Sequence, residues 1–261
     1  MATNSFRAYN SCRRTSTSLH KGEPLMTDIL CYADSYLREF DARIVAHAGK
    51  GVVLDRTPFY PGGGGQPSDT GVLRSGDVEF QVRKMSRVDG ELVHEIDGDA
   101  PAVGESVHGA VDWDRRYQLM RTHTALHILC GVVWRDYGAQ VTGGNMQPLK
   151  ARMDFELENM TAEFADEIEE AINKEVQADR PIAINVLPRD EAFAIPDLIR
   201  TKINLLPPQI AEVRTVDITG LDLQADGGTH VASTGEVGRI RVVGHESKGR
   251  INKRLRIEVD A

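Results

Sequence analysis

The sequence predicts an α+β fold, in which a small N-terminal β-barrel precedes an α+β domain with an antiparallel sheet and one helix that carries an HxxxH motif. Two observations predict it. Short alternating segments, separated by turn residues, fill the chain from about residue 40 to 112. Helical periodicity then begins at Trp113 and alternates with further strand-like segments up to the C-terminus.

Composition sets the class of protein. The chain has 261 residues, of which 41% are hydrophobic and 27% are charged, as in an ordinary soluble globular protein. Its three cysteines, Cys12, Cys31 and Cys130, are too few and too scattered for a disulfide framework. No apolar run approaches the ~18 residues that a membrane span needs. We therefore expect a soluble, cytoplasmic protein that makes no membrane contact.

The first 25 residues are rich in Ser, Thr and Arg and show no apolar periodicity. Met26 precedes a pattern typical of a domain start, so we expect residues 1–25 to be a disordered tail or an over-extended gene start. The change of pattern at Trp113 divides the rest of the chain. We expect a β-barrel domain over 26–112 and an α+β metal-binding domain over 113–261.

The barrel is predicted from at least five short strands within about 70 residues. Each of them mixes β-forming residues with polar alternation, and Gly-Asp or Asp-Gly pairs supply the turns between them. The predicted strands are 42–48, 51–54, 78–85, 91–96 and 106–111.

The second half alternates helices and strands. Apolar residues predict a helix over 114–137 that ends before Gly138, and Thr161 caps an acidic second helix that extends to about residue 178. Apolar residues four apart give this second helix one buried face: Phe164, Ile168, Ile172 and Val176. A strand is predicted at 152–157, and an antiparallel sheet from segments 182–187, 210–218, 237–245 and 250–259.

One unusual segment lies in the barrel region. Residues 57–71 read TPFYPGGGGQPSDTG, with four consecutive glycines just before Gln66. Four glycines permit positive φ angles and a close approach of backbone or ligand, at a high entropic cost. The alternative interpretation is a flexible turn between two strands.

Two histidine-containing motifs predict a metal site. His123 and His127 are four apart on the first predicted helix, so both imidazoles leave the same face. Asp226 and His230 flank a Gly-Gly turn that allows their side chains to converge. Three nitrogens and one oxygen would complete a four-ligand zinc set. Each pair alone is also consistent with ordinary polar contacts.

The C-terminal region is basic. Residues 239–256 contain seven cations against Glu246 alone, in a chain whose net charge is −8. Such a concentration on an acidic protein predicts contact with a phosphate backbone, and a solvated pair of strands is the alternative.

Together these motifs resemble the AlaX-type alanyl-tRNA editing proteins, which are related to the editing domain of alanyl-tRNA synthetase. The glycine-rich Gln motif points to the longer form of this family. The resemblance covers residues 26–259. Four motifs carry it, in the family's order: FYPGGGGQPSDTG at 59–71, RTHTALH at 121–127, GGTHVASTGEVG at 227–238 and SKGRINKRLRI at 247–257. It implies hydrolysis of mischarged alanine-specific tRNA, chiefly seryl-tRNA, with glycyl-tRNA as a second candidate.

The resemblance also implies site residues. In the family, zinc is held by an HxxxH pair and a CxxxH pair, which map onto His123, His127 and His230, with Asp226 where the family usually has Cys. A carboxylate can replace the thiolate, although it is less selective for zinc. Cys130 is a weaker rival ligand, and an empty site is the third alternative. Thr57 and Gln66 match positions near the editing pocket, and four tRNA-binding residues are expected: Lys248, Arg250, Lys253 and Arg254.

Other functions stay open at this point. A non-catalytic tRNA- or protein-binding module that has lost zinc is one alternative, and an editing hydrolase with the specificity of the threonyl-tRNA synthetase family is another. The length leaves no room for a complete aminoacylating enzyme, so we expect neither alanine–tRNA ligase activity nor a nucleotide cofactor. The sequence does not indicate an oligomeric state.

Overall fold

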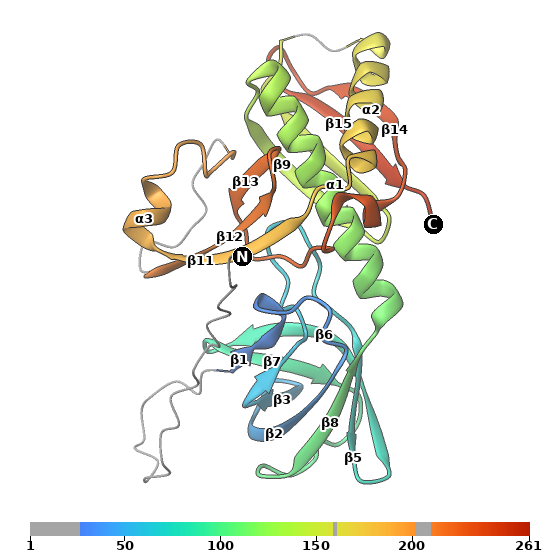
Figure 1. The fold of residues 1–261 in the computed structure, drawn as a ribbon. Helices are drawn as coiled ribbons and strands as arrows, with labels where there is room; N and C mark the ends of the chain where they lie inside the picture. Colours follow the sequence, from blue (N-terminus) through green and yellow to red (C-terminus); the bar gives the residue numbers. More distant parts are fainter. Residues whose placement is uncertain (1–26, 159–160, 202–209) are drawn as a thin grey trace, which may run out of the picture.

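The computed structural model describes residues 27–158, 161–201 and 210–261. It confirms the α+β class, with a closed barrel at one end and α1 between further strands and helices at the other (Figure 1). The predicted tail at 1–25 lies outside the described residues. In the described part, no helix has the length and apolar character needed to cross a membrane. The proposed division of the chain near residue 112 stays a prediction.

Six antiparallel strands close the barrel in the order β2-β3-β7-β6-β5-β8. Side chains of alternating residues fill its interior, because successive residues of a strand point to opposite faces. The five predicted strands are confirmed, and β5 was missed. The barrel strands are β2 (Glu39–Ala48), β3 (Gly51–Leu54), β5 (Gly71–Ser75), β6 (Val78–Val88), β7 (Glu91–Ile96) and β8 (Ser106–Val111).

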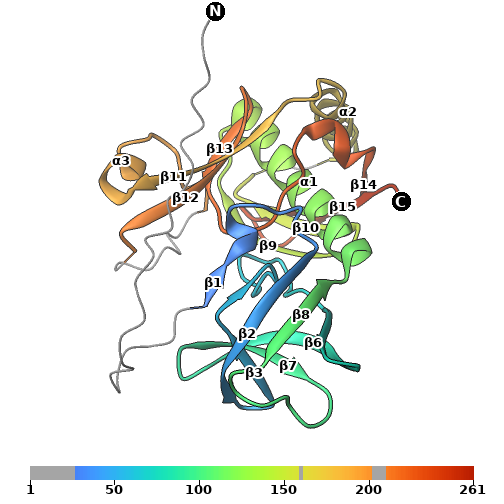
Figure 2. The same ribbon diagram turned by 60° about the horizontal axis from the view of Figure 1, so that its bottom comes forward.

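Helix α1 (Trp113–Tyr137) follows β8 directly (Figure 2). Asp112 caps it by accepting a hydrogen bond from the Arg115 backbone N–H at 3.3 Å, and Gly138 ends it in the left-handed conformation. Every residue from Thr122 to Val133 is buried, so the helix is covered on all sides. It is the central helix of this half of the molecule.

Two antiparallel sheets flank α1, where a single sheet was predicted. One has the order β14-β15-β10-β9 and the other β11-β12-β13. The helix contacts β9, β10 and β15 as well as β13, so it packs against both sheets and keeps them apart. The strands are β9 (Val141–Gln147), β10 (Lys150–Phe155), β11 (Ile182–Pro188), β12 (Glu212–Ile218), β13 (Asp222–Ala225), β14 (Ile240–Ser247) and β15 (Lys253–Val259).

The remaining elements are short, apart from α2 (Ala162–Gln177). The Thr161 hydroxyl caps α2 by accepting a hydrogen bond from Phe164 N at 3.2 Å, as the sequence predicts. The apolar face of α2 packs on α1 and β14. The others are β1 (Asp28–Ile29), β4 (Arg56–Thr57), α3 (Arg189–Phe193) and two 3-10 helices, Leu30–Tyr32 and Thr234–Val237.

A buried ion pair joins the loop between β4 and β5 to the start of α1. Arg116 and Asp69 are both fully covered, and the guanidinium also donates to the carbonyl oxygens of Ser35 at 3.0 Å and Pro58 at 2.6 Å. Asp69 in turn accepts the Tyr60 N–H at 2.6 Å. The loop that carries the glycines and Gln66 is therefore held against the helix that carries His123 and His127.

Candidate metal centre

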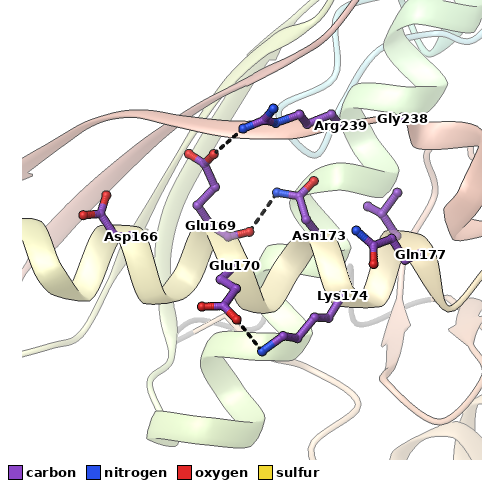
Figure 3. A pocket seen from close by; sticks show the side chains of 9 residues that line it. Asp166, Glu169, Glu170, Asn173, Lys174, Gln177, Gly238 and Arg239 are labelled. Carbon is purple, nitrogen blue, oxygen red and sulfur yellow. Dashed lines mark hydrogen bonds and ion pairs between the residues drawn. The ribbon is translucent and has the colours of Figure 1, made fainter.

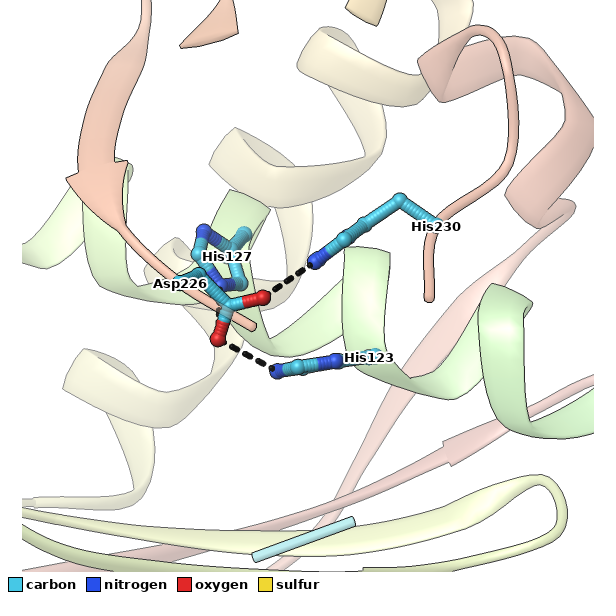
Figure 4. Close-up of side chains that lie close together, drawn as sticks. All are labelled: His123, His127, Asp226 and His230. Atoms are coloured by element: carbon cyan, nitrogen blue, oxygen red, sulfur yellow. Dashed lines mark hydrogen bonds and ion pairs between the residues drawn. The ribbon is translucent and has the colours of Figure 1, made fainter. Parts of the chain in front are cut away.

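Four side chains meet between α1 and the loop that follows β13. Their ligand atoms, one each from His123, His127, Asp226 and His230, all lie within 4.8 Å of one another. The Asp226 carboxylate occupies the middle of this metal-site cluster, with its oxygens 3.6 Å from His123 Nε2, 4.0 Å from His127 Nε2 and 3.0 Å from His230 Nε2 (Figure 4). The structure thus brings together the four residues predicted as ligands.

Helix geometry and strand register explain the convergence. His123 and His127 leave the same face of α1, one turn apart, and their ring centroids are 5.1 Å apart. Asp226 continues the pairing of β13 with β12, because its backbone N–H donates to the Arg214 carbonyl at 3.1 Å. The Gly227-Gly228 turn then reverses the chain and brings His230 Nε2 to Asp226. An added Cβ at Gly228 would lie only 2.2 Å from a His123 ring carbon, so this position requires glycine.

Each imidazole turns Nε2 toward the cluster and is oriented by a hydrogen bond at Nδ1. His127 Nδ1 lies 3.0 Å from the buried Asp222 carboxylate, and His230 Nδ1 lies 3.1 Å from the Thr124 hydroxyl. In both rings Nε2 is the nitrogen that faces the centre of the cluster. The Asp222 carboxylate can only accept, so it fixes the tautomer of His127, and both partners fix the direction of their ring, which raises its quality as a ligand.

Gln66 orients the third imidazole. Its Oε1 lies 3.1 Å from the Thr229 backbone nitrogen, which can only donate, so this atom is an acceptor. The same oxygen lies 3.0 Å from His123 Nδ1, which must therefore carry the proton and leave Nε2 free as an acceptor. The Gln66 amide nitrogen donates to the Thr229 hydroxyl at 2.8 Å. The glycine-rich segment thus contributes directly to the cluster.

The four glycines are needed for this approach. Gly62, Gly63, Gly64 and Gly65 all have positive φ, at 89°, 134°, 57° and 89°, where other residues are strained. Gly65 O accepts the Met146 N–H at 3.2 Å, which ties the turn to β9. A Cβ added at Gly64 would lie 4.0 Å from Asp226 Oδ1, so this turn borders the cluster.

Burial controls the protonation of the cluster. It lowers the pKa of His230 to about 4 and lowers the pKa of His123 well below its usual range. His127 differs: desolvation opposes its charged form, but the Asp222 carboxylate and Asp226 outweigh it, and its pKa is raised. The neighbouring imidazoles hold the pKa of Asp226 well below its usual range against desolvation. The cluster therefore offers a carboxylate and two neutral imidazoles at neutral pH.

The donor set fits zinc. Bonds of roughly 2.0–2.2 Å to nitrogen or oxygen in a tetrahedral arrangement place neighbouring donor atoms about 3.4 Å apart. The three separations from Asp226, between 3.0 and 4.0 Å, bracket that value. Cys130, the rival ligand, is not a member of the cluster: its buried sulfur accepts from Gln224 Nε2 at 3.3 Å, and burial raises the pKa of its thiol.

Thr57, predicted near the pocket, is fully buried in the barrel. Its hydroxyl lies 2.8 Å from His94 Nε2 and accepts the Phe59 N–H at 3.1 Å. These contacts place its side chain among barrel residues, at the start of the loop that leads to the glycines.

The predicted tRNA-binding residues lie in and after the turn between β14 and β15. Lys248 pairs with Glu246 at 2.8 Å, and Arg254 forms two hydrogen bonds with Asp154, at 2.7 and 2.8 Å. Lys253 is buried and donates to two carbonyls of the turn. Arg250 is exposed at the tip.

A groove of about 720 Å³ runs along α2, on a different part of the surface (Figure 3). Asp166, Glu169 and Glu170 line it, and its two cations are neutralised: Lys174 lies 2.8 Å from Glu170, and Arg239 lies 3.5 Å from Glu169. No residue of the metal-site cluster is among the residues that line it, so it does not contribute to this site.

Sequence reasoning missed the residues that surround the ligands: Thr124, Arg214, Asp222 and Thr229. One signal was available. Asp222, Gln224 and Asp226 alternate with Leu223 and Ala225, which is the period of a strand with one polar face. That alternation places Asp222 on the same side as the predicted ligand Asp226.

The fold and this site define a class of protein in which a β-barrel supplies a glycine-rich loop to a histidine-rich centre in an α+β half. Family models match two parts of the chain. Residues 2–115 match the class II (A) tRNA synthetases, and residues 213–256 match the second additional domain of threonyl- and alanyl-tRNA synthetases.

Curated relatives give the family. The chain is 43% identical over 235 residues to the alanyl-tRNA editing protein AlaX-M of Saccharolobus solfataricus, covering 88% of this chain and 98% of that protein. It is 41% identical to AlaX-M of Methanosarcina acetivorans, again over 88% and 98% of the two chains. The chain belongs to the AlaX-M family of alanyl-tRNA editing proteins, which confirms the resemblance. An alanine–tRNA ligase of Ignicoccus hospitalis is 40% identical over 85% of this chain, which spans 25% of that enzyme.

Proposed function

We propose that this chain is a trans-editing hydrolase that deacylates mischarged alanine-specific tRNA, chiefly seryl-tRNA and secondly glycyl-tRNA. The observation that carries the proposal is the metal-site cluster His123, His127, Asp226 and His230 in a chain that matches AlaX-M proteins over nearly their whole length. The tRNA partner follows from the editing function in the relatives' names. The ligase name belongs to a protein of which this chain spans only 25%, so aminoacylation is not part of the proposal.

Zinc is the proposed cofactor, held by the three Nε2 atoms and the Asp226 carboxylate. A bound zinc ion would supply Lewis-acid polarisation at the ester or a water of lowered pKa. The residues of this chain have defined tasks around it. Gln66, Asp222 and Thr124 hold the imidazoles in place, and the glycine turn at 62–65 leaves backbone rather than side chains beside Asp226.

The part of Thr57 is proposed as an indirect one. Its hydroxyl fixes the backbone of Phe59 at the beginning of the loop that carries Gln66. Gln66 itself contacts a proposed metal ligand, which supports its predicted place at the pocket. Cytoplasmic location and contact of tRNA with Lys248, Arg250, Lys253 and Arg254 remain parts of the proposal.

A deacylation panel tests the function. Purified protein, prepared without chelator, is given seryl-, glycyl- and alanyl-tRNA specific for alanine, together with seryl-tRNA specific for threonine, and the free amino acid is measured. We expect seryl-tRNA to be hydrolysed fastest and correctly charged alanyl-tRNA to be spared. Absence of hydrolysis on all three esters would favour a non-catalytic binding module, and preference for a seryl ester on threonine-specific tRNA would favour the other editing family.

Metal analysis of the same preparation tests the cofactor. We expect close to one zinc per chain, and less than a tenth of an equivalent would contradict the proposal. Asp226→Cys exchanges the carboxylate for the softer thiolate, so it should retain zinc longer during dialysis against a chelator. His127→Ala is the matched control that loses a ligand, and it should release zinc faster than both the original chain and Asp226→Cys.

A further inference from the structure

Buried polar atoms without a hydrogen-bond partner gather around the metal-site cluster. Within residues 27–158, 161–201 and 210–261, four buried side-chain atoms lack a partner, and three of them belong to this region: Arg200 Nη1, Arg214 Nη2 and Asp222 Oδ1. A buried donor is normally paired, since leaving it unpaired costs about 1–3 kcal/mol. At a site that binds a ligand, such an atom is available to pair with it.

Arg214 is the one that lies beside a predicted ligand. It stands on β12 across from Asp226, and its Nη1 lies 3.8 Å from the Asp226 carboxylate. Two of its three nitrogens are fixed: Nε donates to Tyr32 O at 2.9 Å and Nη1 donates to Asp226 O at 2.8 Å. The guanidinium is planar, so these two bonds set the direction of Nη2, which has no partner among the described residues.

The cluster is least covered on the side of Arg214. Asp226 keeps 14% of its side-chain surface exposed, against 8% for His127, 5% for His123 and 0% for His230, and Arg214 beside it keeps 10%. The glycine turn borders this side, because Gly64 is exposed and a Cβ added there would lie 4.0 Å from Asp226 Oδ1. A molecule that approaches the cluster therefore passes the guanidinium.

Charge favours an anionic occupant there. Arg214 offsets the charge of Asp226, and Arg200 offsets that of Asp222 at 3.9 Å, so a divalent cation bound by neutral imidazoles would leave two uncompensated positive charges at a site with little solvent. Buried charge is stabilised by an opposite charge, and a guanidinium binds an oxyanion through short charge-assisted hydrogen bonds.

We propose that Arg214 contacts the substrate: its Nη2 donates a hydrogen bond to the ester carbonyl oxygen as that oxygen becomes negative, and then to the carboxylate of the released amino acid. This inference rests on the proposed deacylase function. In the reaction, the oxygen of water bonds to the carbonyl carbon, and the carbonyl π electrons move to the oxygen that faces Arg214. The electron pair then returns, the ester C–O bond breaks, and the ribose oxygen leaves with one of the two protons of that water. The second proton passes to solvent, so the amino acid leaves as a carboxylate. The guanidinium stays protonated throughout.

Arg214→Ala and Arg214→Lys test the contact, with zinc content measured for each. Removing one oxyanion donor lowers kcat by about 10²–10³-fold in other enzymes. We expect a fall of that order in kcat for seryl-tRNA, with KM for the tRNA and bound zinc unchanged. Lysine keeps the charge but lacks the planar second nitrogen, so it should not restore kcat. It also provides a folded variant should alanine at this position prevent folding.

Chemical rescue separates substrate contact from structural support. Guanidinium chloride at tens of millimolar should raise the kcat of Arg214→Ala at least tenfold, whereas the same concentration of sodium chloride should not. Arg83→Ala, which removes an exposed barrel arginine paired with Asp97, is the matched control and should respond to neither salt. Full activity of Arg214→Lys, or absence of rescue in a zinc-loaded Arg214→Ala that folds normally, would overturn the inference.

Acetate binding gives a readout that does not depend on deacylation. Acetate carries the carboxylate of the released amino acid, and acetamide is its neutral control. Calorimetric titration of zinc-loaded protein should show acetate binding at least tenfold weaker in Arg214→Lys than in the original chain, and no such difference for acetamide. Equal acetate affinity in both proteins would contradict the inference. A chain that binds acetate through Arg214 and hydrolyses none of the esters would contradict the proposed function alone.

Discussion

Asp222 and Asp226 lie on the same strand-and-loop segment, but the sequence reveals the role of only one of them. Asp226 was predicted as a ligand from its spacing to His230, and the cluster contains it. Asp222 carries no motif, yet its carboxylate orients His127 at 3.0 Å and also accepts from Gln224 at 2.6 Å. Its role depends on which face of β13 meets α1, and the sequence alone does not specify that packing.

The first prediction concerns Asp222. Partners of metal-binding imidazoles change metal affinity by about 10–100-fold when they are lost. Asp222→Asn keeps the size of the side chain but removes its charge, so zinc affinity should fall about tenfold, and Asp222→Ala should approach a hundredfold. Competition with a chromophoric chelator measures both values. Asp136→Asn, at the exposed end of α1, is the control, and an unchanged affinity in Asp222→Ala would refute the assigned role.

The second prediction concerns Thr57. Valine keeps the shape of threonine but deprives buried His94 of its 2.8 Å partner, which should cost about 1–3 kcal/mol in the free energy of unfolding. Denaturant titration measures this loss. Hydrolysis of seryl- and glycyl-tRNA should then change by the same factor, because Thr57 acts through the loop it begins. A several-fold loss on seryl-tRNA alone would instead show direct contact between its hydroxyl and the serine hydroxyl.

At the scale of elements, the turn between β14 and β15 differs from a free basic patch. Cross-strand register pairs Arg254 with Asp154, and Lys253 holds the turn by donating to Gly249 O and Arg250 O. Residue counting could not detect these pairings, because the acidic partner Asp154 lies about a hundred positions away in the chain. Lys248 and Arg250 remain the accessible members of the predicted set.

The third prediction therefore separates the two accessible basic residues from buried Lys253. Lys248→Gln with Arg250→Gln should weaken tRNA binding and lower the slope of log K against log salt by about one unit per lost phosphate contact. Lys253→Met should instead lower the free energy of unfolding by about 1.5–3 kcal/mol, since it removes hydrogen bonds from a charged group. Fluorescence anisotropy with labelled tRNA measures the first effect. Arg83→Gln with Lys84→Gln on the barrel surface is its control, and an equal salt slope in both double variants would contradict the prediction.

At the scale of the whole molecule, periodic segments were predictable and their assembly was not. Alternation located most barrel strands, and four-residue spacing located α1 and α2. The strands β5 and β9 were missed because each is short or glycine-rich and shows little alternation of its own, whereas β13 alternates but has only four residues. The prediction of one sheet in the second half was wrong, because the burial of α1 on all sides, which separates two sheets, depends on contacts between distant segments.

The last prediction is that the fold loses stability in acid, and the pKa of His94 sets how much free energy of unfolding is lost. Burial lowers the pKa of this barrel histidine from 6.5 to about 4, with its bond to Val52 O opposing the shift. Between these values the unfolded chain binds a proton that the folded chain does not, so the free energy of unfolding decreases as the pH falls from 6.5 towards 4. The difference between pH 7 and pH 5 amounts to about 2 kcal/mol for this one group.

Metal-free protein is the material for that measurement, because bound zinc would add its own dependence on pH through the proposed ligand histidines. Urea unfolding at pH 7 and pH 5 should show a smaller loss in His94→Gln than in the original chain, by about those 2 kcal/mol. His47→Gln, at an exposed barrel position, should leave the full loss in place. An equal loss in the original chain and in His94→Gln would mean that His94 titrates alike in the folded and unfolded states, and that the barrel does not hold it neutral.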